Sequence, residues 1–226
     1  RNLVLFVLLC NSLLFAQAPT ISYSGVQSSY TTNTPMSSLT PTISGGVPTV
    51  RTNVATIAGS GTSGFADGST SSPKFYTPTG VAIAASGNIY IADSQNHCIR
   101  KISASGYVTT FAGSGVPGFL NGVAIVAQFN TPYSIAVDAS ENVYVTETTS
   151  YAVRKITSAG VVSTFAGKET MSGFLDGQGV NALFAAPKGM DVDASGNIYV
   201  ADANNNRIRK ISSTGLVTTV AGDGTA

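Results

Sequence analysis

Three acidic residues recur at matching places in this sequence, and carboxylates of this kind can bind a metal or transfer protons. They are Asp93, Glu147 and Asp202, and each ends an apolar stretch. In two copies an asparagine follows three residues later, as Asn96 or Asn205. A carboxylate at such a place can also accept backbone N–H bonds across a turn, to which asparagine adds local bonds. Because the arrangement returns in every copy, we interpret the three acidic residues as structural turn residues.

A second motif, Gly-Phe-x-Asp/Asn-Gly, offers oxygen ligands for calcium. Its copies lie at 64–68, 118–122 and 173–177. Calcium takes six to eight oxygen ligands, and Asn121 replaces the aspartate in the middle copy. We interpret the motif as a turn whose phenylalanine fills the gap between neighbouring units; these residues are Phe65, Phe119 and Phe174.

The chain contains a single histidine, His97. No cysteine or carboxylate stands at a ligand spacing that would make it a zinc site. We predict no metal, no cofactor and no catalytic residue in this sequence, which favours a protein that is not an enzyme.

The elements that position these residues are repeated along the chain. The tripeptide Arg-Lys-Ile occurs at 100–102, 154–156 and 209–211, with spacings of 54 and 55 residues. Each unit contains four strand-length segments rich in β-branched and aromatic residues. In the first unit they are Gly80–Ala84, Asn88–Ala92, Cys98–Ser103 and Tyr107–Ala112. Such a unit cannot bury both faces alone, so the copies must stack, and the predicted fold is an all-β propeller of four-stranded antiparallel blades.

The amino-acid sequence of the first unit resembles a known repeat. The run Pro-x-Gly-Val-Ala-Ile, Gly-Asn-Ile-Tyr-Ile-Ala-Asp, Asn-His-Cys-Ile-Arg-Lys-Ile at 78–102 is similar to the NHL repeat, whose Asn-His-Leu triplet becomes Asn96-His97-Cys98 here. The resemblance covers about residues 54–226. It implies a TolB-like propeller of about six blades, of which three are present, at about 78–112, 132–166 and 187–221.

The same resemblance implies that the intact ring needs further blades. Residues 54–58 would be the outer strand of a preceding or closing blade, and the three blades would form an open arc with exposed apolar faces. Some relatives of the NHL family are lyases or lactonases that use several histidines, a metal or clustered carboxylates at the ring's centre. This sequence offers none of these, although further blades could supply them.

The first 18 residues are predicted to be a signal peptide. Leu3–Leu9 and Leu13–Ala16 form its apolar part, and Ala16-Gln17-Ala18 has the form of a cleavage site. Residues 19–53 are rich in Ser, Thr and Pro and form either a linker or part of an immunoglobulin-like module. No other stretch is long enough for a membrane helix. This organisation is typical of secreted bacterial proteins, and we expect a secreted or cell-surface location.

Charge gives little indication of a nucleic-acid partner. The chain has 12 Lys and Arg against 11 Asp and Glu, and the loss of Arg1 with the signal peptide makes these numbers equal. No basic stripe suits nucleic acid. By alternation about the isoleucines of the third strands, the recurring Arg-Lys pairs are predicted to lie on a solvated outer rim. These pairs are Arg100-Lys101, Arg154-Lys155 and Arg209-Lys210.

Comparison of the copies separates two faces of loops. The turns after the first strands are nearly identical, although Glu141 stands where Gly87 and Gly196 turn the chain in the other copies. The turns after the second strands vary, and variable loops on a repeated scaffold usually carry recognition residues. The predicted ligand-binding residues are Gln95, His97, Thr148, Tyr151, Asn204 and Asn206.

These uncharged amide and hydroxyl groups suit a protein or carbohydrate ligand. We therefore predict a binding or scaffolding module. Two alternatives remain open: part of a propeller enzyme whose catalytic residues lie in other blades, and a purely structural surface repeat.

Overall fold

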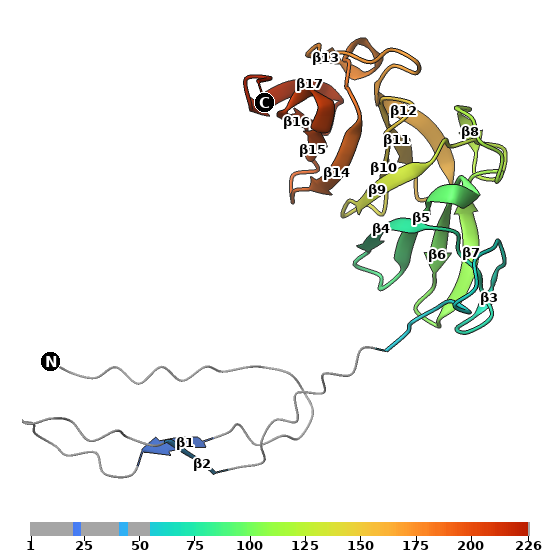
Figure 1. Ribbon diagram of the computed structural model, residues 1–226, viewed down its shortest axis with the longest axis vertical. Helices are drawn as coiled ribbons and strands as arrows, with labels where there is room; N and C mark the ends of the chain where they lie inside the picture. Colours follow the sequence, from blue (N-terminus) through green and yellow to red (C-terminus); the bar gives the residue numbers. More distant parts are fainter. Residues whose placement is uncertain (1–19, 24–40, 45–54, 226) are drawn as a thin grey trace, which may run out of the picture. The chain divides into compact units, whose positions relative to one another are not determined.

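The structure is a computed structural model that describes residues 20–23, 41–44 and 55–225. The chain divides into two compact units, residues 1–55 and 56–226. In the first unit, β1 (Thr20–Tyr23) and β2 (Pro41–Ser44) pair antiparallel (Figure 1). The predicted signal peptide, residues 1–18, and most of the Ser/Thr/Pro-rich segment 19–53 lie outside the described residues.

The second unit contains three five-stranded antiparallel sheets, one for each predicted blade. Blade 1 consists of β3 (Gly68–Ser69), β4 (Pro78–Ile83), β5 (Ile89–Asp93), β6 (Cys98–Ile102) and β7 (Tyr107–Ala112). Blade 2 consists of β8 (Gly122–Val123), β9 (Pro132–Val137), β10 (Val143–Glu147), β11 (Ala152–Ile156) and β12 (Val161–Gly167). Blade 3 consists of β13 (Gly177–Gln178), β14 (Pro187–Val192), β15 (Ile198–Asp202), β16 (Arg207–Ile211) and β17 (Leu216–Ala221). The predicted all-β class and four-stranded blades are confirmed.

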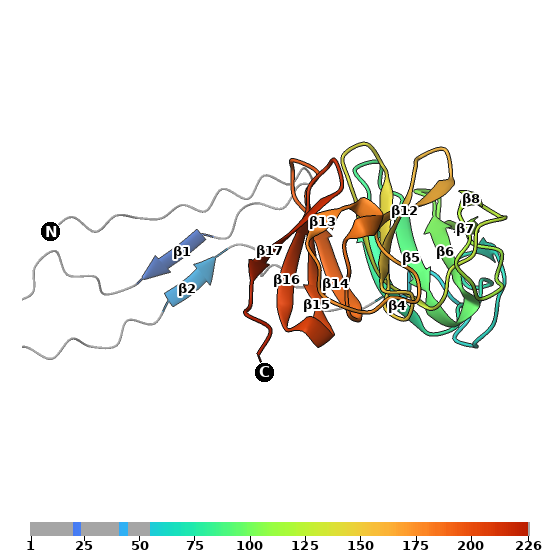
Figure 2. The ribbon, with the colours of Figure 1, turned by 90° about the horizontal axis from the view of Figure 1, so that it is seen from above.

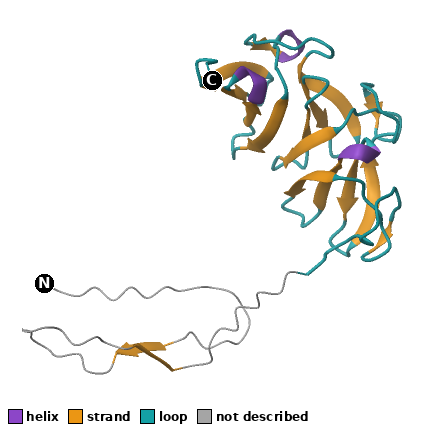
Figure 3. Ribbon diagram, in the orientation of Figure 1, coloured by secondary structure: helices purple, strands orange, loops and turns teal. Residues whose placement is uncertain are grey.

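Each blade also has a fifth, two-residue strand that the sequence did not indicate. It comes from the connection ahead of the blade and pairs with the outermost strand, as β3 does with β7. The described residues contain no α-helix, only the short 3-10 turns η1 (Ser94–Asn96), η2 (Gly179–Asn181) and η3 (Ala203–Asn205) (Figure 3). No helix in this described part is long and apolar enough to cross a membrane.

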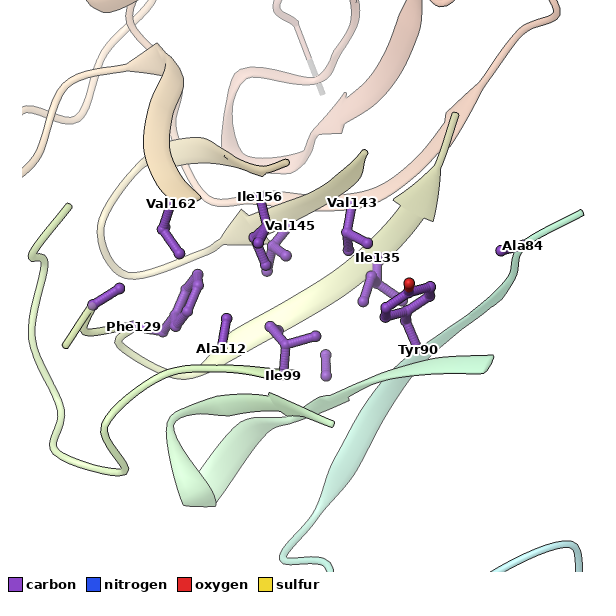
Figure 4. Close-up of a cluster of buried hydrophobic side chains, with 12 residues drawn as sticks. Ala84, Tyr90, Ile99, Ala112, Phe129, Ile135, Val143, Val145, Ile156 and Val162 are labelled. Atoms are coloured by element: carbon purple, nitrogen blue, oxygen red, sulfur yellow. The ribbon is translucent and has the colours of Figure 1, made fainter. Parts of the chain in front are cut away.

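The three blades follow one another in chain order and pack through their sheet faces (Figure 2). Between blades 1 and 2, Ile99 of β6 and Ile135 and Val145 of blade 2 belong to one buried apolar cluster that includes Phe129 (Figure 4). Phe184 takes the corresponding place between blades 2 and 3. Both phenylalanines are completely buried. Apolar side chains on both faces of a blade therefore serve as core.

The predicted exposure of the recurring arginines is wrong. Arg100, Arg154 and Arg209 are completely inaccessible to solvent, although the lysines beside them are half-buried. The physical reason is that each arginine stands two residues before the buried isoleucine of its strand, so alternation places both side chains on the same covered face. The β-bulge beside Arg100 leaves its extra residue, Phe111, on β7, whereas the pairing of Arg100 with β5 is regular.

Candidate functional site

The variable turns after the second strands end in the same left-handed conformation in all three blades. In blades 1 and 3 they are the 3-10 turns η1 and η3, and each ends at a residue in the left-handed conformation. These left-handed residues are His97, Tyr151 and Asn206, with φ between 51° and 55°. Gln95 and Asn204 also donate their backbone N–H groups to Tyr76 and Ala185 in the preceding connections. The turns and the connections therefore lie together.

Three of the six predicted binding residues are freely exposed on these turns. They are Gln95, Asn204 and Asn206. Within the described residues, the side chains of Gln95 and Asn204 make no hydrogen bond, whereas Asn206 Nδ2 donates to the Gly224 carbonyl at 3.5 Å. Gln95 and Asn204 therefore present amide groups that a ligand can reach.

The other three predicted residues are half-buried, and two of them connect blades. His97 Nδ1 accepts a hydrogen bond from the Thr131 N–H at 3.2 Å, which joins blade 1 to the start of blade 2. Thr148 Oγ1 donates to the Pro187 carbonyl at 2.9 Å, which joins blade 2 to blade 3. Tyr151 is half-buried at the left-handed position. His97 and Thr148 thus already use a polar atom within the protein.

Thr149 is an exposed turn residue that the sequence prediction missed. It occupies in blade 2 the place of Gln95 and Asn204, after the same spacings of 54 and 55 residues as the Arg-Lys-Ile tripeptides. Its hydroxyl lies 3.3 Å from the Asn130 carbonyl and 3.2 Å from the Thr131 hydroxyl. Strict alignment of the three turns would have selected it. We call Gln95, Thr149 and Asn204 the turn-tip residues.

Behind each turn, a buried arginine is held by four groups from three other segments of the chain. Arg100 Nη1 donates to Asp93 at 2.9 Å and to the Lys74 carbonyl at 3.0 Å. Its Nη2 donates to Asp67 at 2.6 Å and to the Ala66 carbonyl at 2.8 Å. We call this arrangement the arginine cradle.

Blades 2 and 3 repeat the cradle with equivalent groups. Arg154 pairs with Glu147 at 2.6 Å, and Arg209 with Asp202 at 2.8 Å. On Nη2, Asn121 takes in blade 2 the place of the aspartate, at 2.7 Å. Burial raises the pKa of the Glu147 carboxyl, and the neighbouring Arg154 opposes this shift. The side chain that partners Nη2 needs only to accept a hydrogen bond. In blade 2 the amide oxygen of Asn121 does this in place of an aspartate carboxylate.

The three recurring acidic residues also anchor the connection ahead of their own blade. Asp93 Oδ1 accepts the Tyr76 N–H at 2.7 Å, and Asp202 Oδ1 accepts the Ala185 N–H at 2.7 Å. These donors lie 17 residues upstream, whereas the sequence indicated donors across the following turn. All of these carboxylates are buried.

The phenylalanines of the Gly-Phe motif do not fill the gaps between blades, contrary to the prediction. Phe119 covers the guanidinium of Arg154, with its ring centroid 4.1 Å from Cζ, and Phe129 lies 5.2 Å from it. Phe65 and Phe174 make the same kind of contact and are 53% and 45% exposed. The motif therefore closes the arginine cradle, and a second phenylalanine, such as Phe129, enters the gap between blades.

The described residues, 20–23, 41–44 and 55–225, contain no group of three or more His, Cys, Asp or Glu side chains that could hold a metal ion. Cys98 is completely buried beside β7, and burial raises the pKa of its thiol to about 12. A thiol with so high a pKa stays protonated at neutral pH and is a poor nucleophile. The exposed side chains on the variable turns, Gln95, Thr149, Asn204 and Asn206, offer neutral hydrogen-bonding groups.

Comparison with known proteins agrees with this architecture. The family model described as NHL repeat matches residues 75–102 and 184–211. NHL repeat-containing protein 2 of Bos taurus is 26% identical over 149 residues, which cover 60% of this chain and 20% of that protein. Teneurin-4 of Homo sapiens is 32% identical over 158 residues, which cover 59% of this chain and 6% of that protein. The chain spans only a small part of the length of these curated relatives.

Two solved structures show the same fold. An auxiliary nutrient binding protein from Bacteroides thetaiotaomicron is 24% identical with a TM-score of 0.53, over 62% of this chain and 36% of that one. A protein of the same description from Bacteroides ovatus is 23% identical with a TM-score of 0.53, over 66% of this chain and 39% of that one. Fold and blades thus define a β-propeller architecture. NHL repeats are found in blades 1 and 3, and the relatives include an NHL repeat-containing protein.

Proposed function

We propose that this protein is a binding module and that the turn-tip residues Gln95, Thr149 and Asn204 contact its ligand. The observation that carries the proposal is their equivalence: the same position of three differing turns presents an exposed amide or hydroxyl group. Two of these side chains have no hydrogen-bond partner within residues 55–225, and a ligand could supply one. His97, Tyr151 and Asn206 would border the surface.

The chemistry of this surface favours a neutral, polar ligand, either a carbohydrate or a protein. Amides and hydroxyls supply both donors and acceptors, and no charged side chain occurs among the turn-tip residues. The description of the two similar Bacteroides structures as auxiliary nutrient binding proteins supports a binding role. We also propose that the protein acts outside the cell, for which the apolar stretch and Ala16-Gln17-Ala18 are the support.

The proposal is tested by ligand capture on glycan and peptide arrays, followed by affinity measurements. We expect the combined change Gln95→Ala, Thr149→Ala and Asn204→Ala to weaken binding at least about tenfold, because each lost hydrogen bond contributes about 0.5–1.5 kcal/mol. Ser158→Ala, at an exposed turn after a third strand, is the control and should leave the affinity unchanged. Unchanged affinity in the triple variant would contradict the proposed site.

A further inference from the structure

The arginine cradle of blade 2 has one carboxylate fewer than the other two cradles. Arg100 and Arg209 each pair with two carboxylates, of which one is buried and the other is 45% exposed. Within the described part of the chain, Arg154 pairs with one carboxylate, that of Glu147. Asn121 stands at the place of the exposed aspartate and presents an amide to the guanidinium. Blade 2 therefore carries a neutral group where its two neighbours carry a negative charge.

The amide of Asn121 satisfies this place less completely than an aspartate does. In blades 1 and 3 the aspartate accepts the arginine Nη2 on Oδ1 and a backbone N–H on Oδ2, from Thr110 at 3.3 Å or Thr219 at 3.1 Å. In blade 2 the Asn121 Oδ1 accepts from Arg154 at 2.7 Å, but the other terminal atom, Nδ2, is a donor. It lies 3.4 Å from the Thr164 hydroxyl and cannot accept the Thr164 N–H. A carboxylate at position 121 would supply this acceptor.

Asn121 is exposed and is followed by Gly122, and this is the only Asn-Gly dipeptide in the sequence. In such a dipeptide the glycine nitrogen can attack the side-chain amide carbon, because glycine has no Cβ to hinder the approach. Around Gly122, no atom outside the adjoining residues lies within 4 Å of the place that a Cβ would take. Because β8 pairs with β12 through only Gly122 and Val123, this edge can open locally and free the Gly122 nitrogen.

We propose that Asn121 is a site of spontaneous deamidation and that the product is the aspartate found in the other two cradles. The Gly122 nitrogen loses its proton and forms a bond to Cγ of Asn121, while the Cγ–Nδ2 bond breaks. Ammonia leaves with that proton, and a succinimide ring remains. Water then adds to Cγ, and the bond between Cγ and the Gly122 nitrogen breaks. One proton of the water returns to this nitrogen and the other goes to solvent, which leaves a carboxylate at position 121.

Arg154 promotes both steps at the side-chain carbonyl. Its Nη2 donates to Asn121 Oδ1 at 2.7 Å, so the guanidinium stabilises the negative charge that develops on this oxygen when nitrogen or water adds to Cγ. Attack of water on the backbone carbonyl of residue 121 would instead give isoaspartate. Isoaspartate lengthens the backbone and would disturb the pairing of Val123 with Val161. We therefore expect aspartate to be the main product in the folded chain.

Incubation of the purified full chain at mildly alkaline pH, followed by peptide mass spectrometry, tests the proposal. We expect the peptide that contains Asn121 to gain the mass difference between an amide and a carboxylic acid. An endoproteinase that cleaves before aspartate, but not before isoaspartate, should then cleave at position 121. Asn142 and Asn197 are followed by valine and isoleucine, so they serve as internal controls and should stay unchanged.

Three variants connect the reaction to the cradle, and circular dichroism checks that each folds. Asp176→Asn creates an Asn-Gly dipeptide at the same place in blade 3, beside Arg209, and should deamidate as well. Asn121→Gln keeps the amide but would need a larger ring, so position 121 should stay unchanged. Asn121→Asp, which has the sequence of the product, should unfold at a higher urea concentration than the freshly purified chain.

The proposal is overturned if Asn121 stays an amide in the folded chain, whether or not the chain unfolded in urea is deamidated. It is equally overturned if isoaspartate is the main product of the folded chain, because the carboxylate would then not complete the cradle. A lower urea midpoint for Asn121→Asp than for the unchanged chain would also overturn it.

Discussion

Glu141 adopts the left-handed conformation that glycine provides in the other two blades, with φ of 60° against 83° at Gly87 and 76° at Gly196. Residues with a Cβ atom are strained in this region, and glycine is not. We expect Glu141→Gly to raise the free energy of unfolding by up to about 1 kcal/mol. Urea denaturation measures this change.

The reverse change in blade 1 is the control for this prediction. Gly87→Glu should lower the free energy of unfolding by a similar amount, because a Cβ at Gly87 would meet no atom closer than 4.0 Å. The backbone conformation alone would then cause the loss in the free energy of unfolding. A stabilising Gly87→Glu would show that the turn does not control stability in this way.

His97 gives the contact between blades 1 and 2 a dependence on pH. Burial lowers the pKa of His97 below its usual value, and only the neutral ring can accept the Thr131 N–H at Nδ1. The stability that this neutral ring contributes is present above about pH 6.5, the ordinary pKa of histidine. It is lost as the pH falls through 6.5 towards the lower pKa of the folded protein.

We therefore expect the unfolding free energy of the unchanged chain to fall more steeply between pH 7 and pH 5 than that of His97→Asn. Asparagine is the natural residue at the equivalent place in blade 3, Asn206, and it does not titrate. Urea denaturation at several pH values measures both slopes. Equal slopes would mean that the protonation of His97 is not coupled to folding.

At the scale of the elements, the arginine cradle connects the second and third strands of each blade to the connection ahead of it. Arg154→Met leaves Glu147 buried without its partner, and we expect a loss of about 3–5 kcal/mol in the free energy of unfolding. Without Arg154, the pKa of the buried Glu147 carboxyl would lie further above its value in the unfolded chain, so this carboxyl can be protonated. The loss should therefore be smaller at pH 5 than at pH 8.

Lys155→Met is the control for the cradle, because Lys155 is the neighbouring residue and is only half-buried. Its Nζ lies 5.4 Å from the centroid of the Tyr144 ring, a contact that contributes about 0.5–1 kcal/mol at an exposed site. Denaturation of both variants compares the two positions. Similar losses for Arg154→Met and Lys155→Met would show that the buried arginine has no special role.

The sequence predicted the blades well, because three copies in register define strand positions that one copy would leave ambiguous. Strands of two residues, such as β3, are too short to show a period. The burial of Arg100 was missed because its partners Asp93 and Asp67 lie 7 and 33 residues upstream. The same offsets recur at the other two arginines, and this constant spacing was the available signal.

Prediction of the candidate site was limited in a similar way. The variable turns and their exposed amides could be located from the differences between copies. Local sequence could not show that His97 and Thr148 bond to residues 34 and 39 positions away in the next blade. Which residues of a propeller loop remain available to a ligand depends on how neighbouring blades are joined.

At the scale of the whole molecule, one completely buried phenylalanine belongs to each contact between blades, Phe129 or Phe184. We expect Phe184→Ala to lower the free energy of unfolding by about 3–5 kcal/mol, because it leaves a cavity between blades 2 and 3. Phe75→Ala should cost clearly less, since Phe75 is half-buried and faces no preceding blade among the described residues. Denaturation of both variants gives the comparison, and equal losses would contradict the assignment of Phe184 to the contact.

The arginine cradle also orders events during synthesis of the chain. In all three blades, the hydrogen-bonding partners of the buried arginine precede it, from Ala66 onwards for Arg100 and from Leu175 onwards for Arg209. A ribosome releases the chain from its N-terminus, so each arginine emerges after every group that will bind it. Blade 1 can therefore close around Arg100 while blade 2 is still being translated. The nascent chain then exposes Ile99 and Ala112 of blade 1 until Phe129 emerges and covers them.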